Sequence, residues 1–177
     1  GENPYRTTTL GWEEGSVLDA ALSFLAERGE ERIVLFGTST GGATILIHQG
    51  MRPHAAVVGI VTDGTFWSLG TMLEDAARKY RVPARLHQRT ISEVESRAGY
   101  VVSDVEPARY AERIQVPLLA LHGDRDPLIS PESAPRISES APNGRHVLYS
   151  GRHDKPENTE MQSLVLACDV CRSDQRS

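Results

Sequence analysis

The segment IVLFGTSTGG, residues 33–42, joins a short apolar run to a glycine-rich turn. The β-branched run at residues 32–36 predicts a buried strand, and residues 43–49 predict a helix after the turn. The G-x-S-x-G pattern of residues 37–41 lies between them. A tight strand-to-helix turn of this kind exposes a serine oxygen, so Ser39 is a candidate nucleophile.

Two further features of this turn favour that interpretation. Glycine at positions 37 and 41 lets the backbone bend without a Cβ clash. The N–H of Thr40, at the start of the following helix, points toward any negative charge that develops nearby, and is therefore a candidate oxyanion-hole donor. The alternative is a Gly/Ser/Thr turn that only reverses the chain.

Residues 37–42 also match the first half of a phosphate-binding loop, G-x-x-x-x-G. That motif continues with Lys and Ser or Thr, so that an ammonium group reaches the phosphates. Here Ala43 and Thr44 follow, and the missing lysine disfavours nucleotide binding.

Strands and helices are predicted to alternate along the rest of the chain. An apolar stripe from Val17 to Leu25 predicts a helix that ends near Gly29. Further strands are predicted at residues 55–62, 117–123 and 145–150, and further helices at 68–98 with a break at Pro83, at 107–113, at 131–140 and within 156–171. This order predicts a single α/β domain over residues 1–177. Its sheet is expected to be mostly parallel, with helices on both faces and the chemistry at the carboxyl ends of the strands.

An exposed serine needs an imidazole base and a carboxylate that orients it. Asp126 follows the strand at 117–123, and Asp124 is expected to cap the turn instead. Asp63, after the strand at 55–62, is a second candidate acid. His153 follows the last strand, whereas His122 lies inside an apolar strand and is expected to be a satisfied core residue.

Residues 33–42, 57–66, 116–126 and 151–153 together resemble the α/β-hydrolase family, and residues 153–158 resemble the histidine-bearing loop of its bacterial esterase- and peptidase-like branch. The resemblance implies a partial α/β-hydrolase fold with Ser39 as nucleophile, Asp126 as acid and His153 as base. It also implies an acyl-enzyme mechanism, with the Thr40 N–H in the oxyanion hole.

The chain departs from this family at its start. Family members have three or four strands before the nucleophile strand, and this chain has room for none. The resemblance therefore predicts an exposed sheet edge, which a missing N-terminal segment or a second copy of the chain would cover, and the absence of the second oxyanion donor. The insertion at residues 64–105 is expected to form either a helical lid over an acyl pocket or a helix packed on the sheet.

Composition narrows the function classes. Hydrophobic residues make up 39% and charged residues 24% of the chain, and the net charge of −5 gives nucleic acid or an anionic membrane surface no electrostatic reason to bind. No run is long and apolar enough for a membrane span, and no signal peptide is visible, so a cytoplasmic location is expected. Cys168 and Cys171 form a C-x-x-C pair in a polar tail without further ligands, and no metal or cofactor is expected.

The predicted function is that of a serine hydrolase acting on an ester, amide or thioester of a small acyl substrate. Acyltransferases and cofactor-free haloperoxidases of the same family share the triad and stay open as alternatives. A binding role for an inactive or truncated relative is the alternative from another class.

Overall fold

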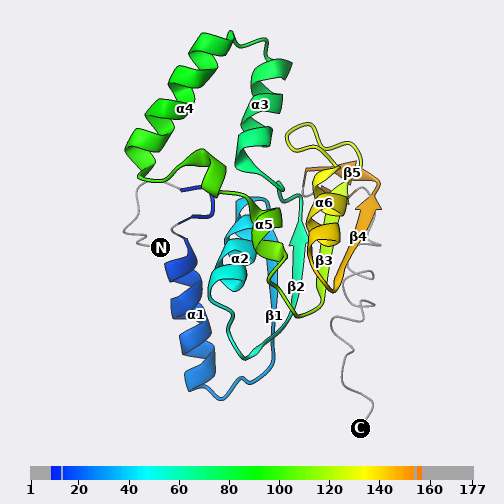
Figure 1. The fold of residues 1–177 in the computed structure, drawn as a ribbon. Helices are drawn as coiled ribbons and strands as arrows, with labels where there is room; N and C mark the ends of the chain where they lie inside the picture. Colours follow the sequence, from blue (N-terminus) through cyan, green and yellow to red (C-terminus); the bar gives the residue numbers. More distant parts are fainter. Residues whose placement is uncertain (1–8, 13, 154, 157–177) are drawn as a thin grey trace.

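The computed structural model describes residues 9–12, 14–153 and 155–156 of the chain. Within these residues, four strands form one parallel sheet in the order β1-β2-β3-β4. They are β1 (Ile33–Thr38), β2 (Val57–Asp63), β3 (Leu118–Gly123) and β4 (Gly144–Tyr149). Figure 1 shows the sheet flanked by helices, which confirms the predicted α/β class.

Helices α1 (Gly15–Glu27), α2 (Thr40–Met51), α5 (Pro107–Ala111) and α6 (Ser133–Ser140) pack against one face of the sheet. Apolar side chains from all four helices and from the strands form one core cluster there. Along β1 the side chains alternate between buried and exposed, and Ile33 and Leu35 point into this core. In contrast, β3 is buried throughout, as its continuous apolar run predicts.

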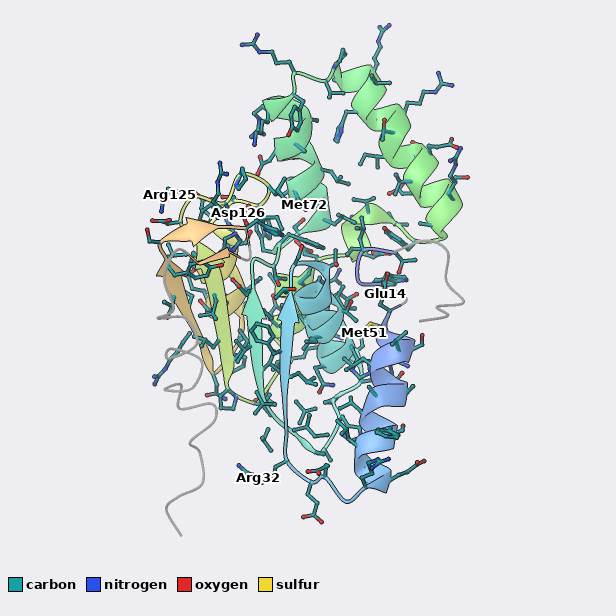
Figure 2. All side chains as sticks on the ribbon, turned by 180° about the vertical axis from the view of Figure 1, so that it is seen from behind. Glu14, Arg32, Met51, Met72, Arg125 and Asp126 are labelled. Carbon is teal, nitrogen blue, oxygen red and sulfur yellow. The ribbon has the colours of Figure 1, made fainter. Side chains whose placement is uncertain are left out.

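The strand β1 lies at the edge of the sheet, and among the described residues it pairs with β2 on one side. The side chains of Val34 and Phe36 are 38% and 52% exposed on the face opposite the helix layer. Figure 2, which views the molecule from behind, shows this face without a described helix on it. The helix predicted within residues 156–171, together with Cys168 and Cys171, lies outside the described residues.

Residues 64–105 contain a pair of helices, α3 (Leu69–Lys79) and α4 (Ala84–Ala98), followed by the 3-10 turn η1 (Val102–Asp104). Figure 1 shows α3 and α4 projecting beyond the carboxyl ends of the strands instead of lying on a sheet face. The break between them falls at Pro83, as the sequence predicts, because a proline has no N–H to donate within a helix. Their inner sides rest on a second apolar cluster around Phe66, Leu69 and Val105.

No helix in the described part of the chain is long and apolar enough to cross a membrane. The cytoplasmic location stays a prediction.

Candidate active site

Ser39 occupies the sharp turn between β1 and α2. Its backbone has φ +50° and ψ −121°, a conformation that residues with a Cβ rarely adopt. The end of β2 holds it there, because the Ser39 N–H donates to the carbonyl of Asp63 (2.8 Å) and its carbonyl accepts from Thr65 Oγ1 (3.1 Å). The side chain is half-buried at the carboxyl edge of the sheet.

The glycines around Ser39 differ in how much space they have. A Cβ on Gly37 would lie 2.7 Å from the Gly41 carbonyl carbon and from the Gly42 nitrogen, and a Cβ on Gly42 would lie 2.0 Å from Thr65 Oγ1. A Cβ on Gly41 would meet nothing within 4 Å. The expectation that Gly41 prevents a clash is therefore wrong, since the close approach on the helix side occurs at Gly42.

Asp126 lies on the loop after β3, and its carboxylate accepts hydrogen bonds at both oxygens. Oδ2 accepts from His153 Nδ1 (2.6 Å), and Oδ1 accepts from the backbone N–H groups of Leu128 (2.8 Å) and Ile129 (3.0 Å). Burial by itself would raise the pKa of Asp126, but these hydrogen bonds outweigh it and hold the pKa below its usual value of 3.8. The fully buried carboxylate is therefore charged at neutral pH.

His153 lies between two short antiparallel strands, β5 (Gly151–Arg152) and β6 (Lys155–Pro156). The end of β3 approaches this segment so closely that a Cβ on Gly123 would lie 2.4 Å from the Arg152 carbonyl oxygen. Asp124 Oδ1 also accepts from the Gly151 N–H (3.0 Å). The sheet therefore positions the imidazole, and its Nδ1 carries the proton because a carboxylate only accepts.

Asp126 and His153, which are 27 residues apart, are thus brought into direct contact. Ser39 lies at the same sheet edge, directly after β1, which is two strands from β3. In the described residues, the hydrogen bonds around Asp126 and His153 do not include the Ser39 hydroxyl.

Asp63, the second candidate acid, is bound to a different group. Its carboxylate accepts from the hydroxyl of Tyr149, at 3.0 Å to Oδ1 and 3.3 Å to Oδ2. Both side chains are buried, and the Asp63 backbone also holds Ser39. Because a phenol binds Asp63 and an imidazole binds Asp126, the geometry favours Asp126 as the acid.

Thr40 is the first residue of α2 and is half-buried. The first N–H groups of a helix have no carbonyl partner within it, so the Thr40 N–H is of the right type to bind an anion beside Ser39.

His122 is a neighbour of Asp126 that the sequence does not reveal. Its Nε2 lies 3.0 Å from Asp126 Oδ2 and 3.2 Å from the Ile129 carbonyl oxygen, so Nε2 carries the proton. The side chain is fully buried, and among the described residues its Nδ1 has no hydrogen-bond partner. The expectation of a satisfied core residue is therefore wrong in one respect, although burial is as predicted. The sequence feature that could have indicated this contact is a histidine in an apolar strand, four residues before the candidate acid.

Burial lowers the pKa of His122 more than Asp126 and the Ile129 carbonyl raise it, so the ring is neutral at pH 7. Replacing His122 with leucine is expected to raise the pKa of Asp126, because the charged carboxylate loses a donor. Glutamine, which keeps an N–H donor, should change it less. Titration of the Asp126 carboxyl carbon by NMR measures both variants, and an unchanged pKa in the leucine variant would contradict the role of His122 as donor.

The Asp126 carboxylate is also expected to make stability depend on pH. Its pKa is depressed in the folded state, so its contribution is complete above the unfolded value near 3.8 and is lost as pH falls through the folded value. At pH 7, Asp126→Asn is expected to lower the free energy of unfolding by on the order of 3 kcal/mol. Urea unfolding at several pH values should show the gap between variant and wild type closing below about pH 4.

The exposed pair between Asp75 and Arg78 offers a control for this experiment. Asp75→Asn is expected to change stability by less than about 1 kcal/mol. A pH-independent gap for Asp126→Asn would show that the carboxylate's charge is not what stabilises the fold.

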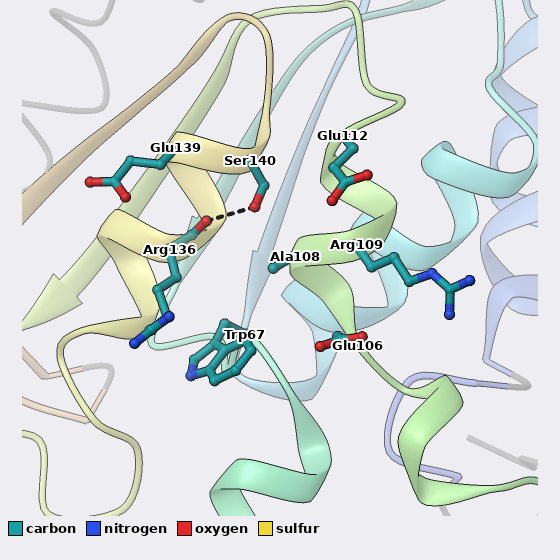
Figure 3. Close-up of a pocket in the computed structure, with 8 residues that line it drawn as sticks. All are labelled: Trp67, Glu106, Ala108, Arg109, Glu112, Arg136, Glu139 and Ser140. Carbon is teal, nitrogen blue, oxygen red and sulfur yellow. Dashed lines mark hydrogen bonds between the residues drawn. The ribbon is translucent and has the colours of Figure 1, made fainter.

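Hollows lie around these elements in the described part of the chain. One hollow, of about 540 Å³, lies between α5 and α6, and none of the candidate residues lines it (Figure 3). There the guanidinium of Arg136 lies 4.8 Å from the centre of the Trp67 ring. A hollow of about 430 Å³ is lined in part by Thr40, and another of about 230 Å³ is lined in part by Asp126. These two hollows therefore adjoin candidate catalytic residues.

No group of three His, Cys, Asp or Glu side chains in the described part of the chain is arranged to hold a metal ion.

A sequence model of the prolyl oligopeptidase family matches residues 18–161, which is most of the chain. The chain belongs to the prolyl oligopeptidase family. Among curated proteins, the uncharacterised protein YqkD of Bacillus subtilis is 26% identical over 159 residues, which cover 86% of this chain and 52% of YqkD. The chain spans about half the length of the curated relatives it matches.

Solved structures place this family member in the α/β-hydrolase fold. The esterase RhEst1 from Rhodococcus sp. matches with a TM-score of 0.62 and 17% identity, over 94% of this chain and 75% of the esterase. A puromycin-hydrolysing peptidase of Mycobacterium tuberculosis matches with a TM-score of 0.64 and 20% identity, over 88% of this chain and 24% of the peptidase. The resemblance drawn from residues 33–42, 57–66, 116–126 and 151–153 is confirmed.

Proposed function

We propose that this chain carries the catalytic residues of a serine hydrolase that cleaves an ester, amide or thioester of a small acyl substrate. The hydrogen bond between His153 Nδ1 and Asp126 Oδ2 is the observation that supports this most directly. It holds the imidazole with Nδ1 protonated and leaves Nε2 as the basic nitrogen. Membership of a hydrolase family, in which esterases and peptidases share the fold, agrees with it.

The proposed reaction has two halves. His153 Nε2 takes the Ser39 proton while Ser39 Oγ bonds to the substrate carbonyl carbon, and the carbonyl oxygen becomes an oxyanion. The imidazolium then returns the proton to the leaving alcohol, amine or thiol, and an acyl-serine remains. Water, deprotonated by Nε2, attacks this ester, and the collapse releases the acid and restores Ser39.

Within this proposal Asp126 keeps its charge throughout. Its buried carboxylate stabilises the imidazolium, and its low pKa means that it takes no proton at neutral pH. The Thr40 N–H is the proposed oxyanion donor. Removing one oxyanion donor typically lowers the rate by about 10²- to 10³-fold. A second donor would therefore raise the rate substantially.

The hairpin of α3 and α4 is the proposed lid. It projects over the edge of the sheet that carries the candidate residues, and its partly buried Met72 and Leu73 supply apolar surface there (Figures 1 and 2). The exposed Val34 and Phe36 support a separate proposal, that another segment or a second copy covers β1.

Incubation with a fluorophosphonate tests the proposal. The Ser39 oxygen would bond to phosphorus and displace fluoride, and peptide mass spectrometry would find the adduct on Ser39. A folded protein that stays unlabelled, or one labelled on another residue, would contradict the hydrolase and favour the alternative of a binding role alone. The circular dichroism spectrum of the same sample establishes that it is folded.

A further inference from the structure

The connection between α3 and α4 carries a dense cluster of positive charge, which we call the basic tip (residues 78–89). Lysine and arginine occupy five of its positions, namely Arg78, Lys79, Arg81, Arg85 and Arg89. No aspartate or glutamate occurs between residues 76 and 92. The net charge of −5 therefore averages over a chain whose charges are unevenly distributed.

Within the part of the chain that the structure describes, three of these cations have no ion-pair partner. The side chains of Arg81, Arg85 and Arg89 are exposed, and no ion pair engages them within the described residues. At the other end of α4, Arg97 is paired with Glu93 (2.6 Å), as surface arginines often are. The basic tip thus presents unneutralised charge to the solvent.

The other two cations connect the basic tip to its surroundings. Arg78 pairs with Asp75 on the same helix (2.8 Å). Lys79 donates to the carbonyl of Pro127, which lies on the loop that carries Asp126. The basic tip is therefore tied to the rest of the molecule at its α3 side.

Two large apolar side chains occur between these cations in the sequence. Tyr80 is 70% exposed and Leu86 is 55% exposed. Figure 1 shows that the α3–α4 connection lies at the end of the hairpin farthest from the sheet, so a flat surface reaches it without meeting the core. Exposed cations around an aromatic and an aliphatic side chain are typical of segments that lie in a membrane interface.

We propose that the basic tip docks on an anionic lipid surface, with the arginines against lipid phosphates and with Tyr80 and Leu86 at the boundary of headgroups and acyl chains. Charge complementarity accounts for attraction to any polyanion. The two apolar side chains favour a lipid surface over nucleic acid, because a phosphate backbone offers them no apolar layer. Docking requires no membrane span and does not depend on the proposed hydrolase activity.

Co-sedimentation with sucrose-loaded vesicles tests this docking. The protein is expected to pellet with phosphatidylcholine vesicles that contain about 30 mol % phosphatidylglycerol, and to stay in the supernatant with phosphatidylcholine alone. Binding should disappear in about 1 M NaCl, where the screening length falls to about 3 Å. The triple variant Arg81→Gln, Arg85→Gln, Arg89→Gln should lower the partition coefficient about 100-fold.

Two further variants make the result specific. A control triple, Arg28→Gln, Arg109→Gln, Arg113→Gln, removes the same charge elsewhere and should bind nearly as well as wild type. The double variant Tyr80→Ser, Leu86→Ser should weaken vesicle binding while leaving weak binding to duplex DNA unchanged. Equal losses in both triple variants, absence of binding to anionic vesicles, or tighter binding to DNA than to vesicles would each overturn the proposal.

Discussion

Replacing Ser39 with alanine is expected to abolish covalent labelling by fluorophosphonates and to remove any esterase activity of the protein. The proposed nucleophile is the only atom lost, and without it neither a phosphoryl-serine nor an acyl-serine forms. Loss of the nucleophile in a serine triad typically costs about 10⁶-fold in turnover. The alanine variant should fold, since the hydrogen bonds that hold residue 39 involve its backbone.

Labelling rates, measured with a fluorescent probe at matched protein concentration, give the comparison. Thr40→Ala is the matched control, because it changes the neighbouring side chain and keeps the N–H proposed for the oxyanion hole. It should label within a few-fold of wild type. If Ser39→Ala still labels at the wild-type rate, another residue is the nucleophile and the proposed triad is wrong.

Replacing Gly37 with alanine is expected to cause the largest loss of stability around the nucleophile turn. The new Cβ would lie 2.7 Å from two backbone atoms in the first turn of α2, the Gly41 carbonyl carbon and the Gly42 nitrogen. Neither can move unless the start of α2 shifts. Overpacking of this kind costs about 3 kcal/mol, and the shift would also displace Ser39.

Gly41→Ala is the matched control in the same motif, and it is not expected to lower the stability. The space around Gly41 is open, and the residue lies within α2. Alanine there is expected to leave stability unchanged or to raise it by up to about 1 kcal/mol, because glycine has the greater conformational entropy in the unfolded chain. Denaturant unfolding of both variants measures the difference. Equal effects of the two substitutions would show that steric closeness at Gly37 does not define the turn.

Local patterns in the sequence were enough to predict most of the elements. The apolar run and glycines of residues 33–42 predicted β1, the turn and α2, because strand burial and backbone freedom depend on neighbouring residues. Pro83 predicted the break between α3 and α4 for the same local reason. The positions of Ser39, Asp126 and His153 after strands followed from the rule that parallel strands end at one edge.

Tertiary structure alone decided which of these groups meet. Asp63 and Asp126 both follow a strand in the sequence, and the folded chain pairs Asp63 with Tyr149 and Asp126 with His153. Tertiary packing also places His122 against Asp126. It puts the tight contact on the helix side of the turn at Gly42 instead of Gly41. The physical reason is that a periodic pattern encodes which side of its own element is buried. Which distant side chain arrives within 3 Å depends on how the elements pack, and no local pattern encodes that.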